Sequence, residues 1–220
     1  MRSVFFILMA AFSLLVLLSE AGDAQTAPAA DACAHDRAAL LALDYDRFDQ
    51  DLNGGWRHVS YAEGCGLVAA ELIAAYSDLN APKLSPHHVK LLNWHEAQLR
   101  ASAGQVAESI ALFERTFDPH PGQTAWNDYV RATLAFMRGD RRALLAARDS
   151  LARTPKPEGF DDISRQFQEK FGSEFRWPAN LDVVDGLIAC FAKPYREAYS
   201  SEACRPRRDP PVQLSPRATP

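Results

Sequence analysis

The chain has 220 residues, with 28 acidic and 24 basic side chains and a formal net charge of -4 at pH 7. Lysine and arginine form no basic stripe in the body of the sequence, whereas phosphate binding needs clustered positive charge. We therefore expect no nucleic-acid partner, and the length allows about one ordinary domain after any leader is removed.

Residues 1–24 have the pattern of a secretory signal peptide. Arg2 supplies a positive start, the stretch from Val4 to Leu18 is almost wholly apolar, and small residues near Ala24 suit cleavage. The apolar run is shorter than the ~20 residues of a membrane span, and an uncleaved anchor is the alternative. We expect a periplasmic or secreted protein with no membrane contact after cleavage, and a flexible mature N-terminus over 25–35.

The mature chain has four cysteines, Cys33, Cys65, Cys190 and Cys204. An even number in an exported protein favours disulfides. Four cysteines allow three pairings, and we predict Cys33–Cys65 with Cys190–Cys204 because short loops close more easily. A structural zinc site is the alternative, but no pair of cysteines or histidines has the spacing of zinc ligands.

Helical periodicity is frequent along the chain, and strand-like alternation is nearly absent, so the sequence predicts an all-α fold. We expect one helical domain over residues 36–200. Its first helix covers about 36–51 and ends at Asn53-Gly54-Gly55, a strong turn signal. A second helix is expected over 67–79.

Two helical hairpins follow, each with a glycine at its turn. Their helices are expected, in chain order, over residues 86–103, 106–117, 124–138 and 141–153. The turn residues Gly104 and Gly139 are 35 positions apart, and so are Trp94 and Tyr129. This spacing is close to the ~34-residue period of tetratricopeptide repeats.

A less regular third hairpin is expected from residues 160–171 and 181–191. Terminal units of helical repeat arrays are usually atypical because they cap the stack. Residues 201–220 are rich in proline and arginine and poor in apolar side chains, so we expect a disordered tail there.

The first hairpin resembles the second half of a tetratricopeptide repeat. Gly104 precedes its second helix, Ser109 takes the small position of the family, Phe113 takes the aromatic one, and Pro119 or Pro121 follows. The second hairpin keeps the turn glycine but not the small and aromatic residues. The resemblance covers about residues 86–155, in units of about 86–119 and 122–155. It implies a short α-solenoid of antiparallel hairpins with non-repeat capping helices.

In that family the first helix of each pair lines a concave groove. Trp94 and Tyr129 would occupy equivalent groove positions, with Gln98 and Thr133 at the next one. A large aromatic side chain with a polar group suits recognition. We therefore predict a protein or peptide partner bound through these four residues. The alternative is that the rings pack between helices, as most aromatic side chains do.

A second functional hypothesis is a calcium-stabilised helical domain. Asp49, Asp51 and Asn53 match the opening of a calcium loop, in which oxygen ligands alternate before a glycine. Ser60 stands where the loop requires a bidentate glutamate. An acidic turn that simply ends a helix is therefore the competing interpretation, and no metal is assigned.

A third hypothesis is a helical hydrolase that uses His95 and Glu96. His88 and His95 share a helix face, but the spacing of metal-binding histidine pairs is missing. No catalytic motif occurs elsewhere, so we expect no enzyme activity and no cofactor. The leading interpretation is an exported helical-repeat scaffold or binding module.

Overall fold

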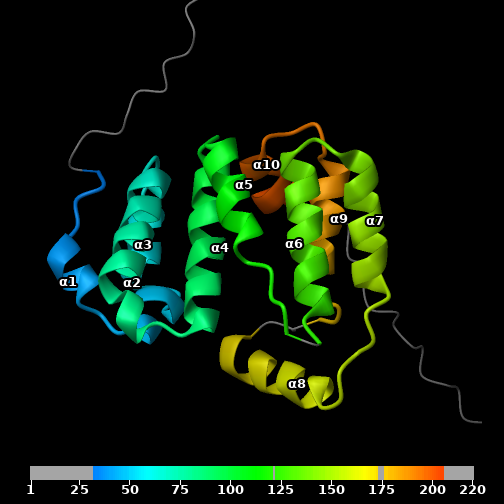
Figure 1. Cartoon of the computed structure of the whole chain (residues 1–220), viewed down its shortest axis with the longest axis horizontal. Coiled ribbons are helices and arrows are strands. Elements are labelled where there is room, and N and C mark those ends of the chain that lie inside the picture. Colours follow the sequence, from blue (N-terminus) through cyan, green and yellow to red (C-terminus); the bar gives the residue numbers. More distant parts are fainter. Residues whose placement is uncertain (1–31, 121, 173–175, 206–220) are drawn as a thin grey trace, which may run out of the picture.

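The computed structural model describes residues 32–120, 122–172 and 176–205, and within them every regular element is helical (Figure 1). The prediction of an all-α protein is confirmed. The predicted signal peptide, residues 25–31 of the mature N-terminal segment and the tail from residue 206 lie outside the described residues. None of the described helices is both long and apolar enough to cross a membrane.

The N-terminal third contains α1 (Arg37–Leu41), a π-helical turn (Asp46–Gln50), α2 (Gly55–Ser60) and α3 (Gly66–Asn80). The single helix predicted over 36–51 is wrong, because the chain turns after α1. Asp36 caps α1, and the carboxylate of Asp44 accepts the backbone N–H of Arg47, which begins a new turn. This turn buries Phe48 against Tyr76 of α3, with their rings stacked 3.7 Å apart.

The four central helices occupy the predicted places. They are α4 (Pro86–Ser102), α5 (Val106–Glu114), α6 (Thr124–Met137) and α7 (Arg141–Ala152). Helix α4 packs against both α3 and α5, and α6 packs against both α5 and α7. Helix α5 ends three residues earlier than predicted. There the Thr116 hydroxyl donates to the carbonyl of Phe113, and the indole of Trp126 donates to the carbonyl of Thr116.

The C-terminal part contains α8 (Phe160–Phe171), α9 (Leu181–Ala189), α10 (Tyr195–Ser200) and a 3-10 turn (Glu202–Cys204). The predicted third hairpin of α8 and α9 is not formed. Helix α8 lies crosswise beneath the other helices (Figure 1), whereas α9 packs against α6, α7 and α10.

Buried side chains form two clusters that meet at α4. One joins α2 and α3 to α4 through residues such as Trp56, Ile73 and Leu92. The larger cluster contains residues of α4, α5, α6 and α7 together with residues of α9 and α10, and it includes Trp94 and Val184. Because neighbouring residues of α4 belong to different clusters, this helix connects the N-terminal third to the rest of the protein.

One disulfide lies near each end of the described part of the chain, and both are the predicted pairs. Cys33 is bonded to Cys65, and Cys190 is bonded to Cys204. Cys204 is buried, and a guanidinium nitrogen of Arg205 donates to the carbonyl of Asp182. Residues 201–205, which the sequence assigned to the tail, are therefore part of the fold. Two disulfides are typical of a protein from an oxidising compartment.

Candidate binding pocket

The four residues predicted to line a groove do lie close together, but the groove is not open. The Trp94 ring centroid is 4.8 Å from that of Tyr129. Trp94, Tyr129 and Thr133 are only 4%, 3% and 1% exposed, and Gln98 is half-buried. The prediction that these side chains present an accessible surface is therefore wrong, and the alternative of interhelical packing is correct.

The physical reason is the C-terminal helix α10, which covers this face. Tyr195 and Ala198 belong to the same buried cluster as Trp94 and Tyr129, and α10 contacts α4 as well as α9. Burial raises the pKa of Tyr129, and the nearby phenols of Tyr199 and Tyr195 raise it further. Helix α10 could not be predicted from the sequence, because its six residues give no recognisable helical period.

The candidate calcium residues do not converge on one point. The Asp49 side chain is fully buried, and its carboxylate accepts hydrogen bonds from Trp56 Nε1 and His95 Nδ1, both at 2.8 Å. The carboxylate of Asp51 instead accepts the backbone N–H of Asn53. Among the described residues, no group of three or more histidine, cysteine, aspartate or glutamate side chains is placed to hold a metal ion. The calcium hypothesis is contradicted, because Asp49 is buried in the core and its carboxylate already accepts hydrogen bonds from protein side chains.

The buried carboxylate of Asp49 stays ionised to low pH. Burial alone would raise its pKa, but the hydrogen bond and charge of His95, with Trp56 and Arg57, outweigh that effect and lower the pKa to about 2. Gly55 makes this arrangement possible. Its φ is +53°, and a Cβ there would lie 2.0 Å from the carbonyl oxygen of Phe48. Glycine is therefore required at position 55 by close packing against the backbone of Phe48.

The two residues of the hydrolase hypothesis, His95 and Glu96, are also engaged with other side chains. His95 is paired with Asp49, and Glu96 is paired with Arg100 at 2.7 Å on the same helix. The ring of His88 stacks on Tyr45 at 3.7 Å, and its backbone N–H is capped by Ser85. The neighbouring residues His95 and Glu96 thus have separate partners and form no common site.

A cavity of about 580 Å³ lies between α5, α6 and α7, in the size range of ligand pockets. We call it the α5–α6–α7 pocket. The α6 residues that line it follow the helical period along one face. They are Asp128, Arg131, Leu134, Ala135 and Arg138. Helix α6 therefore turns one face to the pocket and the opposite one, with Tyr129 and Thr133, to the buried core.

The walls of the pocket come from α5 and α7. Helix α7 contributes only small side chains, namely Ala143, Ala146, Ala147 and Ser150. Phe117, which follows α5, is 38% exposed and lies beside the guanidinium of Arg131. Since α7 has no large side chain on this face, the space above α6 remains open.

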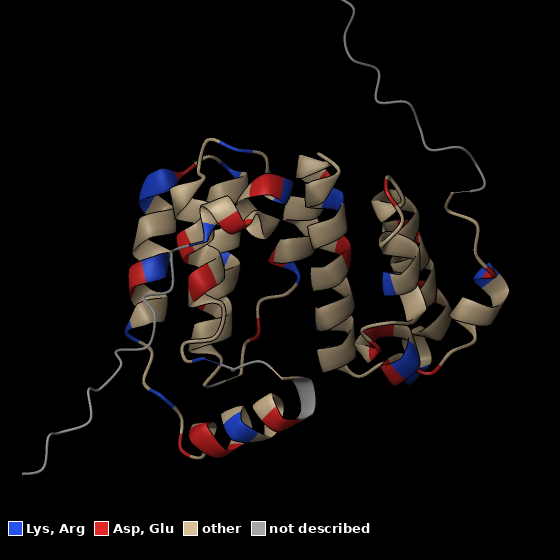
Figure 2. Cartoon of the chain, turned by 180° about the vertical axis from the view of Figure 1, so that it is seen from behind, with Lys and Arg blue, Asp and Glu red and all other residues tan. Residues whose placement is uncertain are grey.

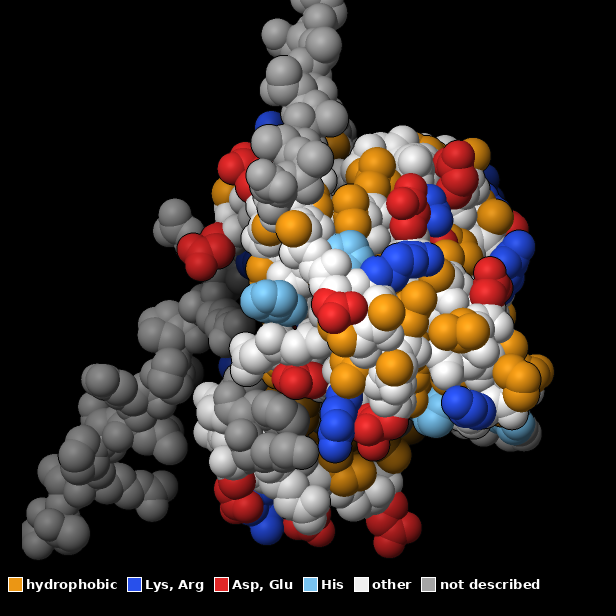
Figure 3. Space-filling view, turned by 90° about the vertical axis from the view of Figure 1, so that its left-hand side faces the viewer, with side chains coloured by type: hydrophobic (Ala, Val, Ile, Leu, Met, Phe, Trp, Pro, Cys, Tyr) orange, Lys and Arg blue, Asp and Glu red, His pale blue; other side chains and the backbone are white. Residues whose placement is uncertain are grey.

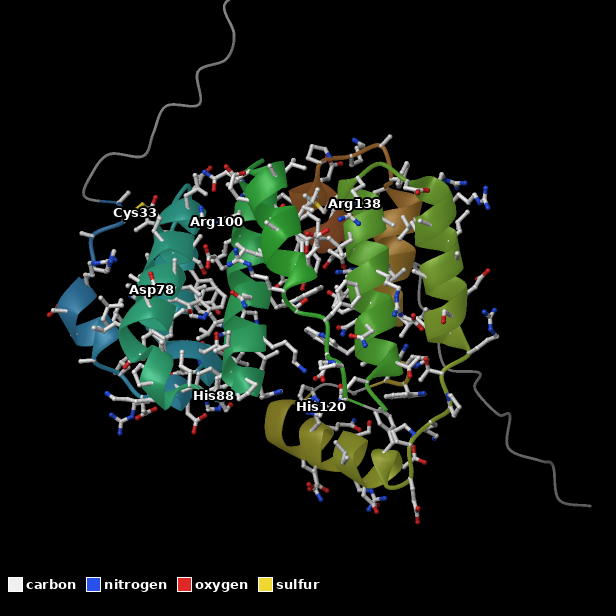
Figure 4. All side chains as sticks on the ribbon, viewed as in Figure 1. Cys33, Asp78, His88, Arg100, His120 and Arg138 are labelled. Carbon is white, nitrogen blue, oxygen red and sulfur yellow. A yellow bond between two sulfur atoms is a disulfide. The ribbon has the colours of Figure 1, made fainter. Side chains whose placement is uncertain are left out.

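Four of the five charged residues that line the pocket form two pairs, and the fifth, Asp140, accepts the backbone N–H of Ala143. Arg138, at the C-terminal end of α6 (Figure 4), is paired with Glu114 of α5. Arg131 Nη1 donates to Asp128 Oδ1 at 2.7 Å. Asp128 is only 2% exposed, and its second oxygen, Oδ2, is buried with no hydrogen-bond partner among the described residues. A buried acceptor without a partner is rare in folded proteins.

Other surfaces of the molecule are mixed. Seen from behind, short basic and acidic segments are scattered along helices whose other residues are uncharged (Figure 2). At the end that carries α1 to α3, apolar side chains are interspersed with charged ones (Figure 3). The α5–α6–α7 pocket is thus the described feature that best combines a cavity, apolar walls and an unpaired buried polar atom.

Comparisons with protein-family models, with curated proteins and with solved structures find no match for this chain.

Proposed function

We propose that this protein is an exported helical-repeat binding module that associates with a protein or peptide through the α5–α6–α7 pocket. The observation that carries the proposal is the pocket itself, which has a volume of about 580 Å³, alanine-rich walls and a buried carboxylate. Pockets that bind side chains combine apolar walls with a few polar groups that fix orientation.

Equivalent geometry at the two turns supports a tetratricopeptide-like arrangement. Gly104 and Gly139 both have positive φ, at +83° and +69°. After each glycine, the next backbone N–H donates at 2.9 Å to the carbonyl five residues before it, in Arg100 and Ala135 respectively. This hydrogen bond is that of a Schellman cap. Repeat units that stack side by side are well suited to binding extended partners.

Equivalent positions in the two hairpins also have equal burial. Ala97 and Ala132 are both fully buried, and so are Ser109 and Leu144. The hairpins thus use the same faces although their residues differ. This supports a two-unit solenoid whose concave face is filled by the chain's own α10, which leaves the α5–α6–α7 pocket as its binding surface.

Export to the periplasm or the exterior is part of the proposal. It is supported by the signal-like pattern of residues 1–24 and by the two disulfides, since disulfides persist in oxidising compartments.

The test compares two substitutions on one helix. Ala146 lines the pocket and is exposed, whereas Ala152 is exposed on α7 but does not line it. Cross-linked partners are recovered from the native envelope and quantified for wild type, Ala146→Trp and Ala152→Trp, with melting curves to show equal folding. We expect the partner to be lost in Ala146→Trp alone. Equal recovery from both variants would contradict the proposal.

A further inference from the structure

Helix α10 covers the face of α4 and α6 that the sequence predicts to be accessible. Tyr195 and Ala198 of α10 are 5% and 0% exposed, and they belong to the same buried cluster as Trp94 and Tyr129. The chain therefore closes off this face with its own C-terminal helix. We call the four residues predicted to line a groove the aromatic face: Trp94, Gln98, Tyr129 and Thr133.

A disulfide encloses α10. Cys190 lies directly after α9, and Cys204 ends the 3-10 turn that follows α10. The bond between them closes a loop of 14 residues that contains the whole helix. A helix of six residues is not stable alone in water, because nucleation costs more than so few hydrogen bonds return. The order of α10 therefore depends on its docking and on the closure of this loop.

The segment that follows α10 is fastened to α9. The guanidinium of Arg205 donates to the carbonyl of Asp182 at 3.1 Å. A Cβ added to Gly186 would lie 3.2 Å from the carbonyl oxygen of Cys204, so the two backbones approach closely. Asp182 and Gly186 both belong to α9. The disulfide thus adds a covalent bond to an attachment that otherwise consists of hydrogen bonds and packing.

The contact of α10 with the helices beneath it has one unfavourable part. The Tyr195 ring centroid lies 6.2 Å from that of Phe113 and 6.1 Å from that of Phe136. The Tyr195 hydroxyl, however, is buried with no hydrogen-bond partner among the described residues. A buried hydroxyl without a partner loses the hydrogen bonds that water would provide. This oxygen therefore favours release of α10, and the disulfide opposes it.

From these observations we infer that α10 is a lid over the aromatic face, which the Cys190–Cys204 disulfide keeps closed and which opens when a dithiol reduces this disulfide. One thiolate of the dithiol attacks Cys190, which is less buried than Cys204, and Cys204 leaves as a thiolate. The second thiol then displaces Cys190 from the mixed disulfide. Two electrons and two protons pass to the chain, which ends with two thiols, while the reductant ends as a disulfide.

The test is hydrogen exchange of the full chain, followed by mass spectrometry. It uses Cys33→Ser/Cys65→Ser, in which the four cysteines of the sequence leave Cys190–Cys204 as the one possible disulfide. The variant is measured with and without dithiothreitol. We expect reduction to accelerate exchange of the α10 amides about a hundredfold, which is the effect of opening a loop of this length. Exchange of the α7 amides should stay unchanged, because a lid opens locally.

Hydroxyl-radical labelling of the same samples measures access to the aromatic face. Trp94 and Tyr129 should be labelled several-fold more after reduction, because α10 no longer covers them. Trp56 is buried in the other cluster, so its labelling should stay the same. Cys190→Ser/Cys204→Ser should show both changes without a reductant, and the wild type without a reductant should show neither.

Unchanged exchange of α10 on reduction, equal acceleration in α10 and α7, or unchanged labelling of Trp94 and Tyr129 would overturn the inference. These results do not bear on the proposed function. The α5–α6–α7 pocket lies on the opposite face of α6 and is tested separately by Ala146→Trp and Ala152→Trp.

Discussion

Asp49 gives the most quantitative prediction about stability, because its carboxylate is buried and fully used. In addition to the hydrogen bonds from Trp56 and His95, the Asp49 carboxylate accepts one from Gln50 Nε2 at 2.6 Å and one from the Tyr45 hydroxyl at 3.1 Å. In Asp49→Asn one acceptor oxygen remains, and the new amide N–H groups face donors. Loss of hydrogen bonds to a buried charged group costs about 1.5–3 kcal/mol each, and partial rearrangement leaves an expected loss of about 3 kcal/mol at pH 7.

The pH dependence follows from the pKa of Asp49. Its pKa is about 2 in the folded protein, against an ordinary value of 3.8 for an aspartate side chain in an unfolded chain. Because folding lowers this pKa, the stabilisation is present above pH 3.8 and is lost as the pH falls towards 2. At about 1.4 kcal/mol per pKa unit, the loss amounts to about 2 kcal/mol.

The assay is urea unfolding followed by far-UV circular dichroism, at several pH values between 7 and 2. The difference between wild type and Asp49→Asn should be about 3 kcal/mol down to pH 5 and about 1 kcal/mol at pH 2. Asp78→Asn changes an exposed carboxylate of α3 (Figure 4) and should alter stability by less than about 0.5 kcal/mol. A difference for Asp49→Asn that stays constant between pH 5 and pH 2 would refute the reasoning.

Three further predictions concern the helical packing, and urea unfolding checks each of them. Leu144→Ala should lower the free energy of unfolding by about 2–5 kcal/mol, because Leu144 is fully buried. Leu145 is 37% exposed, so Leu145→Ala should lower it by less than about 0.5 kcal/mol; similar losses in the two variants would contradict the placement of α7. Gly139→Ala should lower the free energy of unfolding by about 1 kcal/mol through the positive φ alone, since no atom lies within 4 Å of the added Cβ. An unchanged free energy of unfolding would contradict the turn geometry. Replacing Cys190 and Cys204 by serine should cost about 3 kcal/mol, as expected for closing a loop of 14 residues; unchanged stability would contradict this value.

The central helices could be predicted from the sequence because their signals are local. Proline at the start of α4, glycine at the turns and a regular apolar period define α4, α6 and α7 to within one residue. The disulfides followed from loop length in the same way. Trp94 and Tyr129 were also correctly expected to share a face, since a 35-residue spacing repeats the helical register.

The accessibility of that face could not be predicted, because it depends on contacts distant in sequence. Tyr195 and Ala198 cover residues of α4 and α6, and nothing local in α10 indicates where it docks. The buried role of Asp49 has the same origin. Asp49 meets His95, 46 residues later, only after α4 has packed.

The pocket was missed for a related reason. Asp128 is an ordinary acidic residue of an amphipathic helix in sequence, and the sequence alone does not show that it is only 2% exposed in the fold. The period of Asp128, Arg131, Ala135 and Arg138 is the one signal that could have identified a second lined face of α6.

Binding through the α5–α6–α7 pocket is tested most directly by a photo-cross-linking amino acid placed at Ala146 and, separately, at Ala152 in otherwise wild-type protein. The adducts formed in the native envelope are compared by mass spectrometry. The proposal predicts a discrete adduct from position 146 that is absent from position 152. The same adducts from both positions, or none from position 146, would contradict it.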